Sequence, residues 1–300
     1  MTVLECIRSL TGVDCKALPL TACTVRRPYL LEKYGIFTSG TAVFFAVPYV
    51  MSRDAFDPER NVSLYAVPRD YHLYVRELSE TLIPALCAQF ASHRFALFAD
   101  HSPVLEVEAA AKAGLGMIGL NRLLITPDYG SFVFLCEVIT DAGWTETTGL
   151  PESAIPTGDA PTCERCGACL AACPITCGAS GGMETCLSAL TQKKGELTPE
   201  EAERLATHPL VWGCDTCQLA CPHNRRALRM GNDTPLPFFR NHRTVHLTAD
   251  AVSAMSDQDF SARAYAWRGR GVILRNLRIK EGAPDSKTLP GTGNPDKNES

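Results

Sequence analysis

The sequence has no apolar run long enough to span a membrane, and its first residues lack the pattern of a secretory signal. Arg26 and Arg27 are adjacent, but no apolar segment follows them, so they do not indicate twin-arginine export. Charge of one sign is not in large excess either, because the formal net charge is −4. The hydrophobic share of 45% is typical of a chain with a globular core. We therefore expect a cytoplasmic protein with no membrane partner.

The charge is unevenly distributed along the chain. Residues 223–280 contain eleven Arg or Lys against four Asp and no Glu. A basic segment of this kind favours an anionic partner, either nucleic acid or a phosphate-bearing cofactor. The alternative is a solvated basic face, and the composition alone leaves both interpretations open.

Short apolar, β-branched and aromatic runs predict three strands, at residues 40–50, 94–100 and 130–140. Helical periodicity predicts two helices between them, over residues 69–92 and 104–116. Because strands and helices alternate, we expect this half of the chain to form one α/β domain.

Cysteine is abundant rather than scarce. The chain has fourteen cysteines, and nine of them lie between Cys163 and Cys221. A cytosolic compartment keeps thiols reduced, so this number does not indicate disulfides. The clustering instead predicts metal or iron–sulfur ligation.

Two of the cysteine runs have the spacing of bacterial ferredoxins. The run CERCGACLAACP at 163–174 reads C-x2-C-x2-C-x3-C-P, and GCDTCQLACP at 213–222 lacks the first cysteine of that pattern. In the ferredoxin pattern three cysteines hold one cubane and the fourth, before proline, binds the other cluster. The first cluster is therefore expected to bind Cys163, Cys166, Cys169 and Cys221. The second cluster is expected to bind Cys173, Cys214 and Cys217, with one ligand missing.

The missing ligand must come from outside the second run. When the runs are aligned on their closing Cys-Pro, the absent cysteine falls at Val211. Two cysteines lie between the runs, and Cys177 follows Cys173 too closely to be preferred. Cys186 stands at the start of an expected helix and is far enough along the chain to fold back. We therefore expect Cys186 to complete the second cluster.

A single zinc ion held by the two C-x2-C pairs is the alternative. It leaves three cysteines without a role, together with the proline that ends each run. These cysteines are Cys169, Cys173 and Cys221. Two 4Fe–4S clusters account for all of them.

The predicted class is α+β. The expected parts are an α/β domain at 1–150, a ferredoxin-like double-cluster domain at 151–225, a basic C-terminal segment at 226–280 and a disordered tail at 281–300. The polar, Pro- and Gly-containing segment 141–162 is expected to be a linker, and 232–239 a loop. Residues 248–280 are expected to be helical with a basic face.

With a lone CLSALT at 186–191 between its cysteine runs, the chain resembles the epoxyqueuosine reductase family. Four further stretches carry the resemblance in the same order: YAVPRDYHLYV (65–75), DHSPVLEVEAAAKAGLGMIGLN (100–121), GSFVFLCEVIT (130–140) and RGRGVILRNLRIK (268–280). The chain departs from the family pattern at Val107, Met117 and Leu120. We expect a short form without the C-terminal helical-repeat domain of longer members.

The resemblance implies a cytosolic reductase that uses cobalamin and two 4Fe–4S clusters to reduce epoxyqueuosine in the anticodon loop of tRNA to queuosine. In this family a nitroreductase-like α/β domain holds the corrinoid, and an external donor supplies the electrons. The family's acidic aspartate matches Asp100, which on sequence alone equally suits the N-cap of the following helix. The candidate corrinoid-binding residues are Tyr71, His72, Gly114, Gly116, Asn121 and Ser131.

The reaction suits this set of groups, because removal of an epoxide oxygen consumes two electrons and protons and a positioned acid can deliver the latter. Two competing interpretations use the same cysteines. One is a related corrinoid reductase acting on another substrate, such as an organohalide. The other is a ferredoxin-type electron carrier without enzymatic activity, which would not retain cobalamin.

Overall fold

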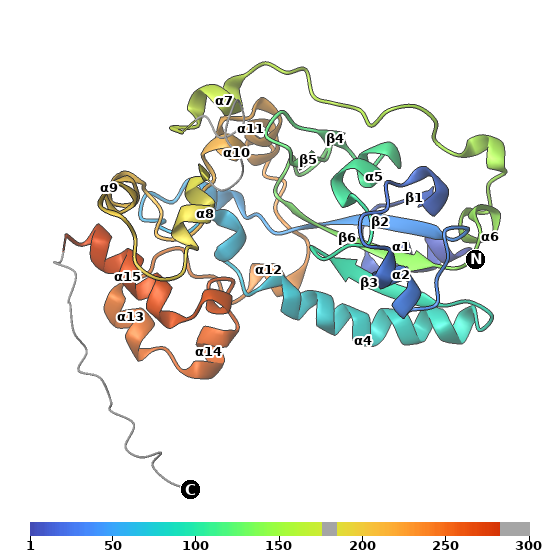
Figure 1. Ribbon diagram of the computed structural model, residues 1–300, viewed down its shortest axis with the longest axis horizontal. Coiled ribbons are helices and arrows are strands. Elements are labelled where there is room, and N and C mark those ends of the chain that lie inside the picture. Colours follow the sequence, from blue (N-terminus) through green and yellow to red (C-terminus); the bar gives the residue numbers. More distant parts are fainter. Residues whose placement is uncertain (176–184, 283–300) are drawn as a thin grey trace, which may run out of the picture.

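The computed structural model describes residues 1–175 and 185–282 (Figure 1). At its centre is a four-stranded sheet in the order β1-β2-β6-β3. Its strands are β1 (Cys15–Pro19), β2 (Thr41–Pro48), β6 (Val133–Thr140) and β3 (Phe95–Ala99). All three pairings are antiparallel, so β2 and β3 both run opposite to the long strand β6 between them.

Helices cover both faces of the sheet. Successive side chains of a strand point to opposite faces, so Phe44 and Phe45 of β2 enter two different apolar layers. The helices of the Phe45 layer are α1 (Val3–Thr11), α4 (Tyr71–Gln89) and α6 (Trp144–Thr148). The helices of the Phe44 layer are α2 (Pro28–Lys33) and α5 (Glu106–Lys112). Being buried on both faces explains why β2 and β6 are almost continuously apolar.

The cysteine-bearing helices lie beside a small hairpin. The hairpin consists of β4 (Met117–Ile118) and β5 (Leu124–Ile125), and it follows α5. Two short helices, α7 (Ala168–Ala172) and α10 (Thr216–Ala220), pack against each other, and α11 (Pro222–Arg229) continues from the second. Figure 1 shows all three helices next to the hairpin, at one end of the sheet.

A helical region forms around the buried aromatic side chains of Trp212 and Tyr265. Its helices are α8 (Leu187–Thr191), α9 (Pro199–Thr207), α13 (Ala249–Ala254), α14 (Asp257–Ser261) and α15 (Arg270–Lys280). The remaining short elements are α3 (Ser52–Ala55), α12 (Pro237–Arg240) and the 3-10 turns Leu20–Ala22, Leu64–Ala66, Glu152–Ala154 and Ala266–Arg268. Within 1–175 and 185–282, no helix combines the length and the apolarity needed to cross a bilayer.

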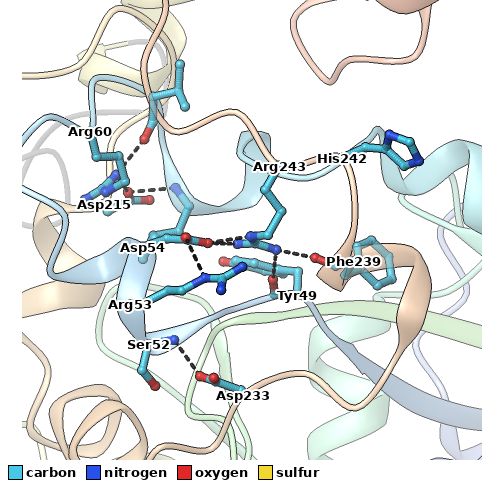
Figure 2. A network of polar contacts seen from close by, with 12 residues as sticks. Tyr49, Ser52, Arg53, Asp54, Arg60, Asp215, Asp233, Phe239, His242 and Arg243 are labelled. Carbon is cyan, nitrogen blue, oxygen red and sulfur yellow. Dashed lines mark hydrogen bonds and ion pairs between the residues drawn. The ribbon is translucent and has the colours of Figure 1, made fainter.

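Two buried ion pairs join the helical region to the segment after β2 (Figure 2). Asp54 of α3 pairs with Arg243, and Arg243 also donates to the carbonyl of Tyr49, at 3.3 Å. Arg60 donates to Asp215 at 2.7 Å, in the loop that leads into α10. Removing one partner of such a pair leaves an uncompensated buried charge, so these contacts fix how the two regions meet.

The structure confirms the α+β class, the three predicted strands and both predicted helices. It also confirms helices within 248–280. The linker prediction is wrong in part, because α6 forms inside 141–162 and buries Trp144, whose indole N–H donates to the carbonyl of Pro151. The loop predicted at 232–239 contains the start of α12. The tail from residue 283 onward lies outside the described residues.

Candidate functional site

Four of the predicted cluster cysteines surround one cavity. The cysteines that line it are Cys163, Cys166, Cys169 and Cys221, the set expected for the first cluster. The turn after β4 forms another wall, where the Leu120 backbone N–H donates to the Sγ of Cys163 at 3.3 Å. Burial raises the pKa of the Cys169 thiol, and Cys163 and Cys221 raise it further. Thiols that are close enough to affect one another are suitably placed to bind one cluster.

A second group of cysteines gathers where α10 meets α8. Cys186 is the N-cap of α8, which confirms the predicted helix start. The pKa of Cys217 is raised to about 12, mainly by burial; Cys214, Cys186 and Cys169 add to the rise, and the side chain of Asn121 opposes it. Cys173 ends α7, and its neighbours Ala172 and Pro174 line a cavity with Leu187 and Thr216. Cys177 lies outside the described residues.

Position 211 cannot supply a ligand in this fold. Val211 is 1% exposed and packs in the same apolar cluster as Trp212. Its backbone N–H donates to the carbonyl of Asn61, and its own carbonyl accepts from the Asn276 side chain. The segment before α10 is therefore part of the helical core.

A separate cavity of about 190 Å³ opens where β3 ends and β6 begins. Tyr71, Asp100, Glu106 and Ser131 line it, together with apolar side chains such as Phe134. A larger cavity of about 650 Å³ adjoins it and shares Asp100 and Glu106. Its volume falls within the range of about 300–1,000 Å³ that is typical of small-molecule sites.

Asp100 occupies an unusual backbone position. It directly follows β3 and has φ 66°, a left-handed conformation that costs a non-glycine residue on the order of 1 kcal/mol. Helix α5 starts at Glu106 with Leu105 as its N-cap, so the alternative role of Asp100 as a helix cap is wrong. Strain of this kind often occurs where a side chain must face a ligand.

The two predicted aromatic candidates differ in position. Tyr71 stacks on Phe134 with ring centroids 4.2 Å apart and lines the smaller cavity, and burial raises its pKa, so the hydroxyl stays protonated. His72 is exposed, and its Nδ1 lies 2.9 Å from a carboxylate oxygen of Asp70, which raises the pKa of the imidazole. Of these two residues, only Tyr71 is among those that line the cavity.

The two predicted glycines have local backbone roles. Gly114 adopts φ 87° immediately after α5 and has open space around it. At Gly116 a Cβ atom would come within 2.4 Å of the Ile125 carbonyl oxygen. This close approach is to the neighbouring hairpin strand of the same chain, so packing explains it.

Ser131 connects the smaller cavity to the cysteine helices. Its Oγ donates to Oε1 of Gln218 at 3.0 Å and accepts from Nδ2 of Asn224 at 2.8 Å. Gln218 directly follows Cys217, and Asn224 lies on α11. Asn121, predicted beside the corrinoid, lines the cavity of the first cysteine group and contacts Cys217.

Two glutamates near Asp100 were not anticipated from the sequence. Glu106 lines both cavities, and Glu137 of β6, which is close enough to Glu106 to interact with it electrostatically, is fully buried at 0% exposure. A signal for Glu137 was present, since it is a single charge inside the apolar strand VFLCEVIT. Glu106 gave no such signal, because acidic residues are common in the first turn of a helix.

The sequence matches known iron–sulfur proteins. Residues 162–224 match the family model described as a 4Fe-4S double cluster binding domain, which identifies an iron–sulfur protein. Among the described residues, no group of three or more His, Cys, Asp or Glu side chains is arranged to hold a metal ion. The chain belongs to the epoxyqueuosine reductase family.

Three curated epoxyqueuosine reductases illustrate the relationship. The protein of Burkholderia pseudomallei is 38% identical over 225 residues, which are 74% of this chain and 53% of that protein. That of Pseudomonas aeruginosa is 36% identical over 76% of this chain and 62% of its own length. That of Gloeobacter violaceus is 32% identical over 73% of this chain and 67% of its own length. The chain thus spans about half to two thirds of the length of these relatives.

Solved structures of epoxyqueuosine reductases share the fold. The enzyme of Streptococcus thermophilus superposes with a TM-score of 0.69 at 21% identity, covering 92% of this chain and 79% of that one. The Bacillus subtilis enzyme gives a TM-score of 0.69 at 24% identity, with 92% and 80% covered. A further structure, with a TM-score of 0.67 and 24% identity, contains an epoxyqueuosine-modified tRNA-Tyr stem loop and covers 92% and 80%.

Proposed function

We propose that the protein is a cobalamin- and iron–sulfur-dependent reductase that converts epoxyqueuosine to queuosine in tRNA. The observation that carries the proposal is the hydrogen bond between Ser131 and Gln218, because it joins the wall of the Asp100 cavity to the residue after Cys217. Electrons that leave the clusters at this point enter the cavity by a short route. Membership of the family supports the choice of reaction.

The eight cysteines divide into two sets of four in this proposal. The shared cavity supports the first set, Cys163, Cys166, Cys169 and Cys221. The effects of Cys186 and Cys214 on Cys217 and the packing of α7 on α10 support the second set, Cys173, Cys186, Cys214 and Cys217, and the effect of Cys169 on Cys217 agrees with two adjoining sites. Each run then contributes one cysteine to the other run's cluster, which keeps the two clusters close together.

The cavities beside Asp100 suit a corrinoid. Apolar side chains of the smaller cavity, such as Val107 and Phe134, would pack against a flat macrocycle, with Tyr71 and Ser131 at its edge. Arg27 of the larger cavity would hold polar side groups. When bound there, cobalamin would supply a strongly reducing metal centre at the substrate.

Asp100 is the proton donor in this proposal. Its side chain is exposed to both cavities, and its left-handed backbone is maintained by the turn that follows β3. The oxygen released from an epoxide is strongly basic as an alkoxide, so an acid positioned at the cavity would accelerate its departure by ~10²–10⁴-fold.

Transfer RNA and an external electron donor are the proposed partners, acting in the cytoplasm. The tRNA complex solved for a relative supports the first. Part of the basic segment has another role, since Arg243 and Arg270 are engaged with Asp54 and Asp257. The arginines left exposed for phosphates are Arg225, Arg226, Arg229, Arg240 and Arg278. Binding through them would weaken as salt increases.

Two measurements test the proposal. Cluster-containing protein incubated with cobalamin and then desalted should keep the visible spectrum of the corrinoid, whereas a ferredoxin-type carrier would lose it. Reconstituted protein with a reductant should then form queuosine in epoxyqueuosine-containing tRNA.

The acid role is tested by one variant and its control. The variant Asp100→Asn should turn over ~10²–10⁴-fold more slowly while keeping its iron and cobalamin. The exposed Asp159 lies away from both cavities, so Asp159→Asn should behave as wild type. Full activity of Asp100→Asn would refute the acid role.

A further inference from the structure

Two glutamates close to one another, Glu106 and Glu137, have buried carboxyl oxygens near the cavity wall that holds Asp100. Glu137 is in the middle of β6, paired with Phe44 of β2 on one side and Phe98 of β3 on the other. Among the described residues, neither of its carboxyl oxygens has a hydrogen-bond partner of good geometry, although Ser102 faces it. Oε2 of Glu106 is also buried without a partner in the same part of the structure. An ionised carboxylate in such surroundings is costly unless it is paired.

The surroundings of Glu106 favour its neutral form. Its pKa is raised to about 7, mainly by burial and secondly by Asp100, while Arg27 and the backbone amide of Asp100 act in the opposite direction. Glu137 has its pKa raised well above the ordinary value by burial and by Glu106, so it stays protonated while Glu106 titrates. Tyr71, which lines the smaller cavity, is neutral at these pH values, and Arg26, Arg122 and Glu108 are the further charged groups that line the larger one.

We propose that Glu106 is a proton store that reloads Asp100, so that one site can deliver both protons of the reaction. The inference rests on the proposed function and deepens it. The geometry that carries it is the wall shared by Asp100 and Glu106 in both cavities, and the buried, unpartnered Oε2 of Glu106.

The balance of the reaction requires a second proton. When an epoxide becomes an alkene, both C–O bonds break, a C=C bond forms, and the oxygen leaves as water. Two electrons are consumed, supplied singly through the clusters by an external one-electron reductant, together with two protons. Asp100 gives the first proton and then accepts the proton of Glu106, which it passes on as the second. Solvent in the larger cavity restores the protons of both Glu106 and Asp100 after turnover.

The pH profile of kcat tests this role. In the wild type, kcat should fall as pH rises through about 7, because Glu106 loses the proton that it must supply. Glu106→Gln has the same shape but no acidic proton, so kcat should drop by at least about tenfold with KM little changed. The fall of kcat near pH 7 should then be absent from its pH profile. Glu106→Asp keeps a carboxyl group and should recover part of the rate. Glu77→Gln, an exposed carboxyl of α4, should change neither.

A second readout does not depend on turnover. Infrared difference spectra of the substrate-free protein should show a protonated carboxyl band that disappears as pH rises through about 7, and this band should be missing in Glu106→Gln. Glu106 found ionised throughout, or an active wild type whose rate and pH limb survive in Glu106→Gln, would overturn the role of Glu106 alone. A wild type that forms no queuosine at any pH would overturn the proposed function, and the role of Glu106 with it.

Discussion

The buried position of Glu106 predicts an unusual dependence of stability on pH. Its pKa is about 7 in the folded protein against an ordinary value of 4.5, so the folded state binds more protons than the unfolded state between these values. Stability therefore falls as pH rises from about 4.5 to about 7, and no further loss from this group occurs above that. The sign is opposite to that of a carboxylate that is stabilised by a cation.

The size of the effect follows from the same two values. At 1.36 kcal/mol for each pH unit, the difference between 4.5 and about 7 corresponds to about 3 kcal/mol. Glu106→Gln cannot ionise and should escape this loss. The variant is expected to match the wild type near pH 5 and to be more stable by up to about 3 kcal/mol near pH 8. Glu137 is present in both proteins, so its own contribution cancels in the difference.

Thermal unfolding at several pH values measures this difference. The wild type and Glu106→Gln should be compared with equal cluster content, at one scan rate, because iron–sulfur proteins often unfold irreversibly. Their Tm values should diverge by several degrees between pH 5 and pH 8, with the variant higher at pH 8. The exposed Glu77→Gln variant serves as the control and should follow the wild type. Parallel curves for wild type and Glu106→Gln would refute the reasoning.

Two further predictions concern the cluster region. The variant Cys186→Ser should lose half of the iron, because it removes a ligand of one cluster. The control Cys87→Ser, at an exposed cysteine of α4, should keep all of its iron. Full iron content in Cys186→Ser would contradict the ligand assignment. The variant Asp215→Asn leaves Arg60 buried without its charge partner, so its free energy of unfolding, measured by heat or urea, should fall by about 3–5 kcal/mol. The control Asp257→Asn removes the partner of Arg270 at the surface and should have little effect. Unchanged stability of Asp215→Asn would show that the pair does not hold the two regions together.

The sequence predicts those parts of the fold that depend on local pattern. The strands around Phe45 and Val138 are continuous apolar runs bounded by turns, and α4 has a clear helical period, so all three were found. Strand β1 was missed because CKALP is short and ends in proline. The antiparallel directions also could not be read, because the long connections of this half fit either direction.

For the candidate site too, the sequence predicts what depends on local spacing and misses what depends on tertiary packing. The spacing of the cysteines along the chain limits which of them can bind the same cluster, so the ferredoxin pattern could be read from the sequence. The prediction that position 211 supplies no ligand agrees with the burial of Val211 in the core. The surroundings of a side chain depend on tertiary packing, so the sequence did not show that Asn121 contacts Cys217. Glu106 was missed for this reason as well, since nothing in its sequence neighbours shows that it faces Asp100.

The most direct test of the account is the nucleoside content of tRNA after reaction. Epoxyqueuosine-containing tRNA should be incubated with the cluster- and cobalamin-loaded protein and a one-electron reductant, then digested and analysed by mass spectrometry. The account predicts that epoxyqueuosine disappears and that queuosine appears in equal amount, only when both cofactors are present. Unchanged epoxyqueuosine in the presence of fully loaded, reduced protein would contradict it.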